Sequence, residues 1–266
     1  DLKIHELEAL REAARADWRK VSPAIFGTLL ERALSAAERA KLGAHYTPEP
    51  YIRRLVEQTI IAPLRAEWAL VRAEMERSRQ TAKSVSEGRK KAVKLGADYR
   101  TKLATLRVLD PACGSGNFLY VAMRDLKRLE AEVERALLAT GGYQRPLDFE
   151  GASVHPVQFF GIELKPWAAK IAELVLWIGY LQWQTSAGRL GLMQDPLIKD
   201  LHHIEARDAL ISWKRIRPLV DDDGEPVLRA MGVSDKKAVR KMAPVSEYVG
   251  VQVAPWPDAD YIVGNP

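Results

Sequence analysis

Residues 106–118 of the chain read LRVLDPACGSGNF. The first four of these residues form a short apolar strand, and apolar residues at helical spacing follow Gly116. Glycines let the backbone come close to a ligand, and the first turn of a helix has free N–H groups that can bind one. A strand, an acidic residue, a Gly-x-Gly turn and a helix together predict a nucleotide-binding corner.

This corner differs from the dinucleotide-binding fingerprint at two positions. The fingerprint has a third glycine or alanine where this chain has Leu119, and Asp110 would repel a phosphate. An acid at the end of a strand suits a ligand with a positive charge, such as the ammonium of S-adenosylmethionine. The residues alone therefore favour a positively charged nucleoside over a dinucleotide.

The composition is that of a soluble globular protein. With 266 residues, of which 47% are hydrophobic and 28% charged, the chain can bury one α/β core and a smaller helical appendage. The longest apolar stretch, 171–183, is too short to span a membrane, and we find no signal peptide. The single cysteine excludes an internal disulfide and fits a reducing compartment, so we expect a cytoplasmic protein. Because residue 1 is Asp, we expect the chain to begin inside a longer polypeptide.

The net charge of +5 is mild, but its distribution is uneven. Between Arg65 and Lys102 there are eleven Lys and Arg residues against five Asp and Glu residues. Such a surface can follow a phosphate backbone. A solvated helical face is the alternative interpretation, and the sequence does not decide between them.

Helical patterns dominate the first hundred residues. They cover 1–41, a helix after Pro48 with Thr47 as its N-cap, and a helix from about Pro63 into the basic stretch, poorly ordered near 84–88. After residue 106, strands and helices alternate, which favours a parallel sheet. We expect strands at 106–109, 158–162, 202–206 and 259–263, and helices at 117–139 and 166–185. We expect insertions at 140–157 and 214–256, the latter with a hairpin at 218–228 and a basic helix at 236–241.

Four segments resemble, in the same order along the chain, motifs of the adenine-N6 DNA methyltransferases. DPACGSGNF at 110–118 is similar to motif I, and FGIEL at 160–164 is similar to motif II. GAHYTP at 43–48 is similar to motif X, and IVGNP at 262–266 is similar to the start of motif IV. The order X, I, IV is that of the γ class. The resemblance covers roughly residues 22–266.

The resemblance implies a Rossmann-like class I S-adenosylmethionine-dependent methyltransferase sheet, an α/β fold preceded by a helical region. We expect a helical region at 1–103, which includes motif X and the basic stretch, and the cofactor-binding half of the catalytic domain at 104–266, truncated at motif IV. The family's sheet has seven strands, so about half of it is expected here, with the natural protein continuing beyond residue 266. Residues 25–31 and 42–47 look most like large fused methyltransferases of type IIG/IIL restriction–modification systems and of the DISARM and BREX phage-defence systems.

The resemblance also implies the cofactor, S-adenosyl-L-methionine, and the residues that bind it. Asp110 would bind the methionine moiety. Glu163 would accept hydrogen bonds from both ribose hydroxyls, and Asp208 would accept one from the exocyclic amine of the adenine. The other cofactor contacts it implies are His45, Tyr46, Thr47, Pro111, Ala112, Gly114, Gly116, Asn117, Phe118, Leu164 and Ala209. Trp167 and Trp177 are equally good core residues and are left out of the site.

The resemblance places the catalytic step at Asn265 and Pro266. The carbonyls of these residues would accept both N–H bonds of an adenine amine, whose lone pair is otherwise delocalised into the ring. A base inside a duplex cannot reach such a pocket, so the base must flip out. No metal and no covalent enzyme intermediate is required. Cys113 lies outside the position of a cytosine-C5 nucleophile and is interpreted as a small packing residue.

The function implied is adenine-N6 methylation of DNA by a fragment of a restriction–modification or phage-defence protein. Its first partner would be double-stranded DNA, bound by a target-recognition region beyond this chain and, as a second candidate contact, by the basic stretch 65–102. Restriction or defence subunits would be further partners, and no membrane is expected. We expect this piece alone to bind cofactor weakly or not at all and to show no turnover. Two alternatives stay open: a protein glutamine-N5 methyltransferase, which shares an Asn-Pro-Pro-Tyr motif, and a non-catalytic DNA-binding or scaffold subunit that retains the cofactor fold.

Overall fold

A parallel four-stranded sheet lies at the centre of the protein. The computed structural model describes residues 3–15, 21–23, 25, 47–144, 153–186, 203–230 and 242–265. The strands are β1 (Val108–Asp110), β2 (Phe159–Glu163), β3 (Ile204–Ala206) and β10 (Tyr261–Ile262), in the order β10-β1-β2-β3. The four strands expected from the sequence are therefore confirmed, each within three residues of its expected bounds.

The sheet has a point at which its strand order reverses. The chain adds β2 and β3 on one side of β1 and then returns to place β10 on the other side, where Val108 pairs with Tyr261. Open α/β sheets bind ligands beyond the carboxyl ends of their strands, at such a reversal. The ends of β1 and β10 are therefore the first place to look for a site.

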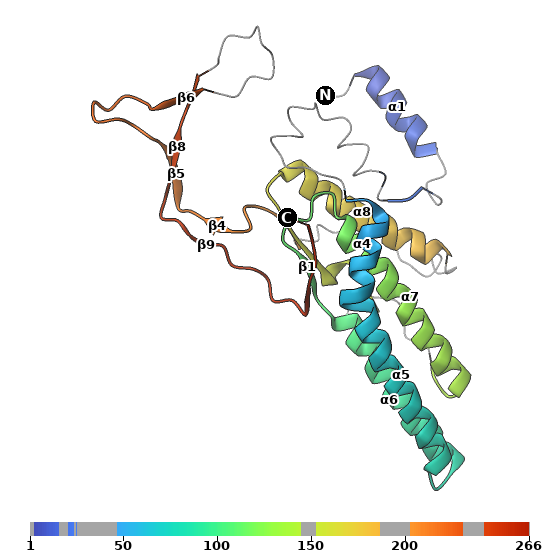
Figure 1. Ribbon diagram of the computed structural model, residues 1–266. Helices are drawn as coiled ribbons and strands as arrows, with labels where there is room; N and C mark the ends of the chain where they lie inside the picture. The colour runs from blue at the N-terminus through green and yellow to red at the C-terminus, as the bar shows by residue number, and fades with distance from the viewer. Residues whose placement is uncertain are drawn as a thin grey trace.

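Two long helices pack on the sheet and build its core. They are α7 (Asn117–Thr140) and α8 (Pro166–Ser186), which confirm the two helices expected here. Both contact β2 and each other, so they cover the same face (Figure 1). Leu119, Leu126 and Leu129 of α7 are fully buried, as their helical spacing requires. A short 3-10 turn, η3 (Pro156–Gln158), precedes β2.

A helical hairpin extends away from the sheet beside α7 (Figure 1). Its first arm consists of α4 (Glu49–Val56), a π-helical turn η2 (Glu57–Ile61) and α5 (Ala62–Thr81), and its second arm is α6 (Val85–Thr105). The expectation of poor order near 84–88 is wrong. The Ser84 hydroxyl accepts a hydrogen bond from the Glu87 N–H and caps α6, so this segment is an ordered helix start.

Thr47 does not cap the helix that follows it. The N-cap of α4 is Pro48, whose carbonyl accepts hydrogen bonds from the N–H groups of Tyr51 and Ile52, and no side chain caps this helix. The Thr47 hydroxyl is engaged in another contact instead. Further upstream, α1 (Ile4–Arg15) confirms part of the N-terminal helical pattern.

Several expectations concern residues outside the described ranges. These are residues 26–41 of the expected N-terminal helical pattern, the basic helix at 236–241, His45, Tyr46 and Pro266. The division into regions at 103/104 stays a prediction. Within the described part of the chain, no helix has the length and apolarity to cross a membrane.

A buried charged cluster joins α6 to α7. The Arg100 guanidinium contacts Glu134 at 3.1 Å and Glu130 at 3.3 Å. The Lys127 ammonium lies 3.2 Å from Glu130 and 3.4 Å from the Ser153 hydroxyl. The cluster is almost completely buried and contains as many positive as negative side chains, so each charge has the partner that burial demands.

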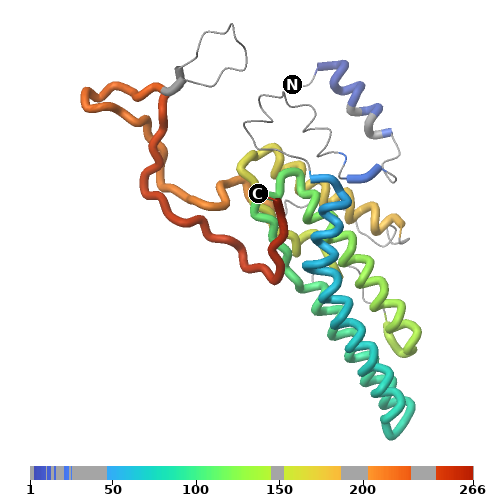
Figure 2. The backbone as a smooth tube through the Cα atoms, viewed as in Figure 1, coloured from blue at the N-terminus to red at the C-terminus, as the bar shows by residue number. Residues whose placement is uncertain are grey.

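The insertion between β3 and β10 is a long arm of paired strands (Figures 1 and 2). Its ribbons are β4 (Ile211–Ser212) with β9 (Gln252–Val253), β5 (Arg215–Pro218) with β8 (Ser246–Val249), and β6 (Leu228–Ala230) with β7 (Met242–Pro244). The hairpin expected at 218–228 is confirmed, with Val220 bridged to Pro226 around an acidic turn. The arm leaves the sheet in a different direction from the α5–α6 hairpin.

The β5–β8 ribbon, the β6–β7 ribbon and the 219–227 hairpin meet at a ring of backbone hydrogen bonds. The Leu219 N–H donates to the Val245 carbonyl, the Val245 N–H donates to the Val227 carbonyl, and the Val227 N–H donates to the Leu219 carbonyl, each at 2.8 Å. The ring satisfies one donor and one acceptor of every residue at the branch point. The arm can therefore divide without leaving these backbone groups unpaired.

Candidate active site

Asp110 lies at the carboxyl end of β1 and is 1% exposed. Its Oδ1 accepts a hydrogen bond from the Ala112 N–H at 3.0 Å, and its buried Oδ2 has no hydrogen-bond partner in the described structure. Burial, together with the nearby negative charge of Glu163, raises the pKa of Asp110 to about 7, against the opposing effect of the Ala112 hydrogen bond. A cation beside this carboxyl would reverse that shift and hold it ionised.

The turn after β1 depends on its two glycines. Gly114 and Gly116 have φ angles of 54° and 79°, in the left-handed region that favours glycine. A Cβ on Gly116 would lie 2.9 Å from the Cα of Ala172, so the start of α7 can approach α8 only without a side chain here. A Cβ on Gly114 would meet no atom within 4 Å, so this part of the turn faces open space. A ligand can reach the backbone at that point.

Glu163 ties the end of β2 to this turn. Its Oε2 accepts from the Gly114 N–H at 2.9 Å, and its Oε1 accepts from the Lys165 N–H at 2.8 Å. Each carboxylate oxygen has a further lone pair, so both can still accept a hydroxyl. The two roles, clamp of the turn and acceptor for a diol, are compatible in this geometry.

Cys113 is buried and faces the sheet. It is 5% exposed, and its Sγ lies so close to Gly161 that a Cβ there would be 2.7 Å from the sulfur. Burial and the nearby charges of Asp110 and Glu163 raise the pKa of the thiol well above its ordinary value. A protonated, buried thiol is a poor nucleophile, so the structure agrees with a packing role.

A second buried acceptor without a partner lies at the start of α7. The Oδ1 of Asn117 is buried and accepts no hydrogen bond within the described residues, as is true of Asp110 Oδ2. Buried acceptors without donors are costly, and their presence at one corner fits a ligand that supplies N–H groups. Phe118, the next residue, is 6% exposed and belongs to the hydrophobic core.

The end of β10 closes the site from the other side of β1. A Cβ on Gly264 would lie 2.5 Å from Asp110 Oδ1, so the backbone at this position lies directly against the carboxylate. The next residue, Asn265, donates from Nδ2 to the Thr47 hydroxyl at 3.1 Å. Three segments far apart in the sequence, at 47, 110 and 264–265, therefore meet here. The red end of the chain reaches the green corner after β1 in Figure 2.

Asp208 forms the turn after β3. Its Oδ1 accepts from the N–H groups of Leu210 at 2.7 Å and Ile211 at 3.1 Å. The carbonyl of Ala209 accepts from the indole N–H of Trp256 at 2.6 Å. Asp208 thus shapes the segment that leads into the arm, and only one of its carboxylate oxygens is used for this.

Two residues of the site were missed by sequence reasoning. Gly264 precedes Asn265 in the motif IV segment, and that position was the available signal for its close approach to Asp110. Arg207 donates to the carbonyls of Asp208 and Pro255, at 3.2 and 2.7 Å, and pairs with Glu205. No local pattern in the sequence indicates the contact between Arg207 and Pro255.

The aromatic residues near β2 divide into a surface and a core position. Trp167 is 41% exposed, and nearby Leu164 is 57% exposed. Trp177, in contrast, is 5% exposed and packs against His155. The interpretation of Trp177 as a core residue is therefore correct. The same interpretation of Trp167 is wrong, because this side chain lies at the surface near the start of α8.

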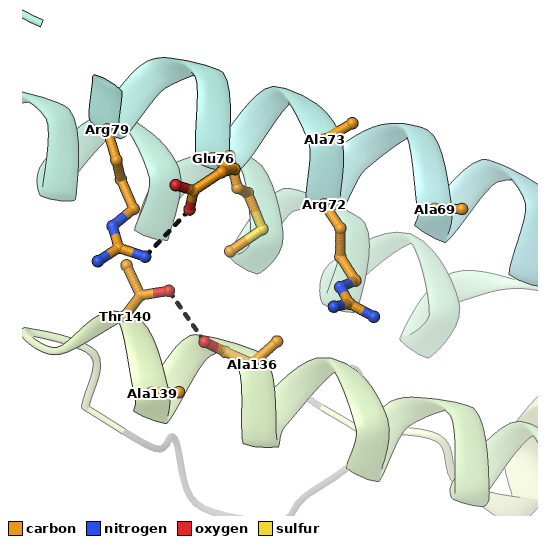
Figure 3. Close-up of a pocket in the computed structure, with 9 residues that line it drawn as sticks. Ala69, Arg72, Ala73, Glu76, Arg79, Ala136, Ala139 and Thr140 are labelled. Carbon is orange, nitrogen blue, oxygen red and sulfur yellow. Dashed lines mark hydrogen bonds and ion pairs between the residues drawn. The ribbon is translucent and has the colours of Figure 1, made fainter. Parts of the chain in front are cut away.

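A separate cavity of about 550 Å³ lies between α5 and α7 (Figure 3). Four of its nine lining residues are alanine. Arg79 is paired to Glu76 at 3.2 Å, and the Thr140 hydroxyl donates to the carbonyl of Ala136 in its own helix. We assign no ligand to this cavity. No group of three or more His, Cys, Asp or Glu side chains in the described ranges could hold a metal ion.

The chain matches a family of known proteins over most of its length. Residues 84–266 match the family described as MmeI, DNA-methyltransferase domain. Among solved structures, the type IIL restriction–modification enzyme MmeI in complex with DNA superposes with a TM-score of 0.57 at 32% sequence identity. That similarity covers 75% of this chain and 24% of the MmeI chain.

Two curated proteins are also similar. DNA methyltransferase A of Bacillus subtilis (strain 168) is 30% identical over 162 residues, which is 61% of this chain and 16% of that protein. A putative type II restriction enzyme and methyltransferase of Methanocaldococcus jannaschii is 24% identical over 208 residues, 73% of this chain and 17% of that protein. The chain thus spans less than a fifth of the length of these relatives.

Proposed function

Because the chain belongs to the MmeI DNA-methyltransferase family, we propose that it transfers a methyl group from S-adenosylmethionine to the N6 amine of an adenine in DNA. The observation that carries this proposal is the contact of Asp110 with Gly264, which joins the expected cofactor residue to the expected catalytic Asn265 at the strand reversal. We assign the sheet to the Rossmann-like class I methyltransferases. The parallel strand order and the helices α7 and α8 support this assignment.

The residues of the corner fit the cofactor. S-adenosylmethionine supplies a methyl group on a positively charged sulfur, together with an ammonium group and a ribose diol. The unpartnered oxygens of Asp110 and Asn117 would accept from the ammonium, and the Gly114 backbone would line the same end. Glu163 would accept the two ribose hydroxyls on the lone pairs that its backbone contacts leave free. Asp208 would accept from the adenine amine.

Asn265 would act on the base that receives the methyl group. Its Nδ2 donates to Thr47, which leaves Oδ1 to accept a hydrogen bond from the target amine. With the carbonyl of Pro266 as the second acceptor, both N–H bonds would be held out of the plane of the base. This frees the nitrogen lone pair for attack, and proximity to the methyl group supplies much of the acceleration.

The biological setting we propose is a restriction–modification or phage-defence system. MmeI and the Methanocaldococcus jannaschii relative are both described as restriction–modification proteins, which supports this setting. Double-stranded DNA would be the substrate, and restriction or defence subunits would be the partners.

The substrate class is tested by labelled methyl transfer in the full-length enzyme. We expect radiolabel from S-adenosylmethionine to appear in duplex DNA and, after digestion to nucleosides, to co-elute with N6-methyl-2′-deoxyadenosine. A release-factor-like protein with an exposed glutamine loop is the competing acceptor. Label in that protein and none in DNA would establish the glutamine-N5 alternative, and label in neither would favour the scaffold alternative.

Thr47 is predicted to orient the catalytic amide. Replacing Thr47 with valine removes the hydroxyl that accepts from Asn265 Nδ2, so the amide can rotate and present N–H in place of its carbonyl. We expect kcat to fall about 10- to 100-fold. Thr47→Ser keeps the hydroxyl and should retain most of the activity. Cofactor affinity, measured by calorimetry, distinguishes this role from the cofactor contact expected for Thr47, because loss of a direct contact would raise the Kd as well.

A further inference from the structure

The arm between β3 and β10 has a stem with two different faces. We define the stem as residues 211–218 paired with 246–253. Its register sets Arg217 opposite Glu247 and Ile216 opposite Tyr248, and successive side chains of a strand point to opposite faces. One face of the stem therefore carries Arg215 and Arg217, and the other carries Ile216 and Tyr248.

Both faces of the stem are open. Residues 215–218 are all exposed, and Ile216 and Tyr248 are 51% and 46% exposed. The ring of Trp213 lies 4.5 Å from that of Tyr248 and lengthens the apolar face toward the sheet. A ribbon of two strands without a covering layer is marginally stable in water. We therefore expect a partner to cover the stem.

The root of the stem is fixed to the candidate active site. Arg207 donates to the Pro255 carbonyl at 2.7 Å, the Ala254 N–H donates to the Leu210 carbonyl at 2.9 Å, and Trp256 bonds to Ala209. One strand of the root comes directly from Asp208, and the other strand leads through β10 to Asn265. The stem thus leaves the molecule where a target base would enter.

The charge and dimensions of the stem favour a nucleic-acid partner. It carries Lys214, Arg215 and Arg217 against one acid, Glu247, and only Arg217 is paired with that acid. Its strands pair at 211–212 and at 215–218, an interrupted run of eight residues that spans at most about 27 Å. A two-stranded ribbon is narrow enough to enter the DNA major groove. A protein partner would instead be expected to bind the apolar face, which carries Ile216 and Tyr248, rather than the face with the arginines.

We propose that the stem binds the target duplex beside the methylated base, with Arg215 and Arg217 on the phosphate backbone. This inference rests on the proposed function, since it takes duplex DNA as the substrate. The stem would add contacts that are independent of the cofactor corner. It would hold the duplex while the base is in the site.

The test compares two double variants of the full-length enzyme. Arg215→Gln with Arg217→Gln removes two cations from the stem. Arg128→Gln with Arg135→Gln, the matched control, removes two exposed arginines from α7, of which one is also ion-paired. Binding of a fluorescent duplex is measured from 50 to 300 mM salt. We expect the stem variant to lower the slope of log Kd against log salt by about 2 and to raise Kd roughly tenfold, with the control unchanged.

Three further readouts decide the outcome. Arg215→Lys with Arg217→Lys keeps both charges and should restore the slope, and cofactor affinity should be equal in all variants. An unchanged slope in the Gln variant overturns the proposal. So does a loss of activity with Ile216→Ser and Tyr248→Ser alone, because that result assigns the stem to a protein partner. If the slope falls as expected but the wild type transfers no methyl group to DNA, the proposed function fails, and only the binding of duplex DNA by the stem stands.

Discussion

Replacing Asn265 with alanine is expected to slow methyl transfer to DNA by about a thousandfold while changing cofactor affinity less than about twofold. The alanine removes the acceptor that we assign to the target amine, so the nitrogen lone pair stays delocalised into the base. The Asp110 corner is not altered, because its contact with this strand is made by the backbone of Gly264. Single-turnover transfer of labelled methyl groups gives the rate, and calorimetry gives the affinity.

Asn265→Asp is the matched control for this prediction. Aspartate has nearly the same shape and keeps an acceptor oxygen, but it has no N–H to donate to Thr47. We expect a rate between those of the wild type and the alanine variant. If the alanine variant kept a tenth of the wild-type rate, another group would be presenting the amine, and the catalytic assignment of Asn265 would be wrong.

Replacing Asp110 with asparagine is expected to weaken S-adenosylmethionine binding roughly a hundredfold. A buried carboxylate beside a cation is a strong, charge-assisted partner, and a neutral amide is not. In the wild type the raised pKa of about 7 means that protons compete with the ligand, so binding should weaken as the pH falls below 7. The Asp110→Asn variant should show no such pH dependence. Calorimetry between pH 5.5 and 8.5 measures both effects.

The same substitution should stabilise the protein without cofactor. The pKa of Asp110 is raised from 3.8 to about 7 on folding, so the native state binds the proton more tightly than the unfolded state. Stability from this group is therefore full below about pH 4 and is lost as the pH rises to about 7. Asparagine does not ionise, so at pH 8 Asp110→Asn should raise the free energy of unfolding by roughly 2–4 kcal/mol.

Denaturant unfolding at pH 5 and pH 8 tests this second effect. The gain in stability should be much larger at pH 8 than at pH 5. Asp98→Asn, at an exposed position of α6, changes the formal charge by the same amount and should alter stability by less than about 0.5 kcal/mol. A destabilised Asp110→Asn protein at pH 8 would show that the carboxylate is satisfied in the native state.

The sheet and its helices could be predicted because their signals are local. The periodicity of α7 and the apolar run of β1 are readable within a few residues, and so is the Gly-x-Gly turn. Ser84 and Glu87 have the spacing of a helix cap, so the start of α6 also has a local signal. Local patterns therefore account for the sheet and for the two helices packed on it.

What could not be predicted depends on contacts between distant segments. The one signal for the contact of Gly264 with Asp110 is its place before Asn265 in the motif IV segment. Nothing near Thr47 indicates its bond to Asn265. The charged cluster of Arg100 with Glu134 follows from the packing of α6 on α7, which has no sequence signature of its own. The arm was expected as an insertion with one hairpin, but its stem pairs residues that are 28 to 42 positions apart.

The absence of a side chain at Gly264, where the backbone lies against Asp110, has a consequence for redesign. Because the two segments touch through backbone and carboxylate, the distance between methyl donor and acceptor would be set without any contribution from the side chain at 265. An engineer could exchange that side chain to admit a different nucleophile and leave the donor where it is. A larger side chain at position 264 would instead collide with Asp110 and separate the donor from the acceptor, whichever residue stood at 265.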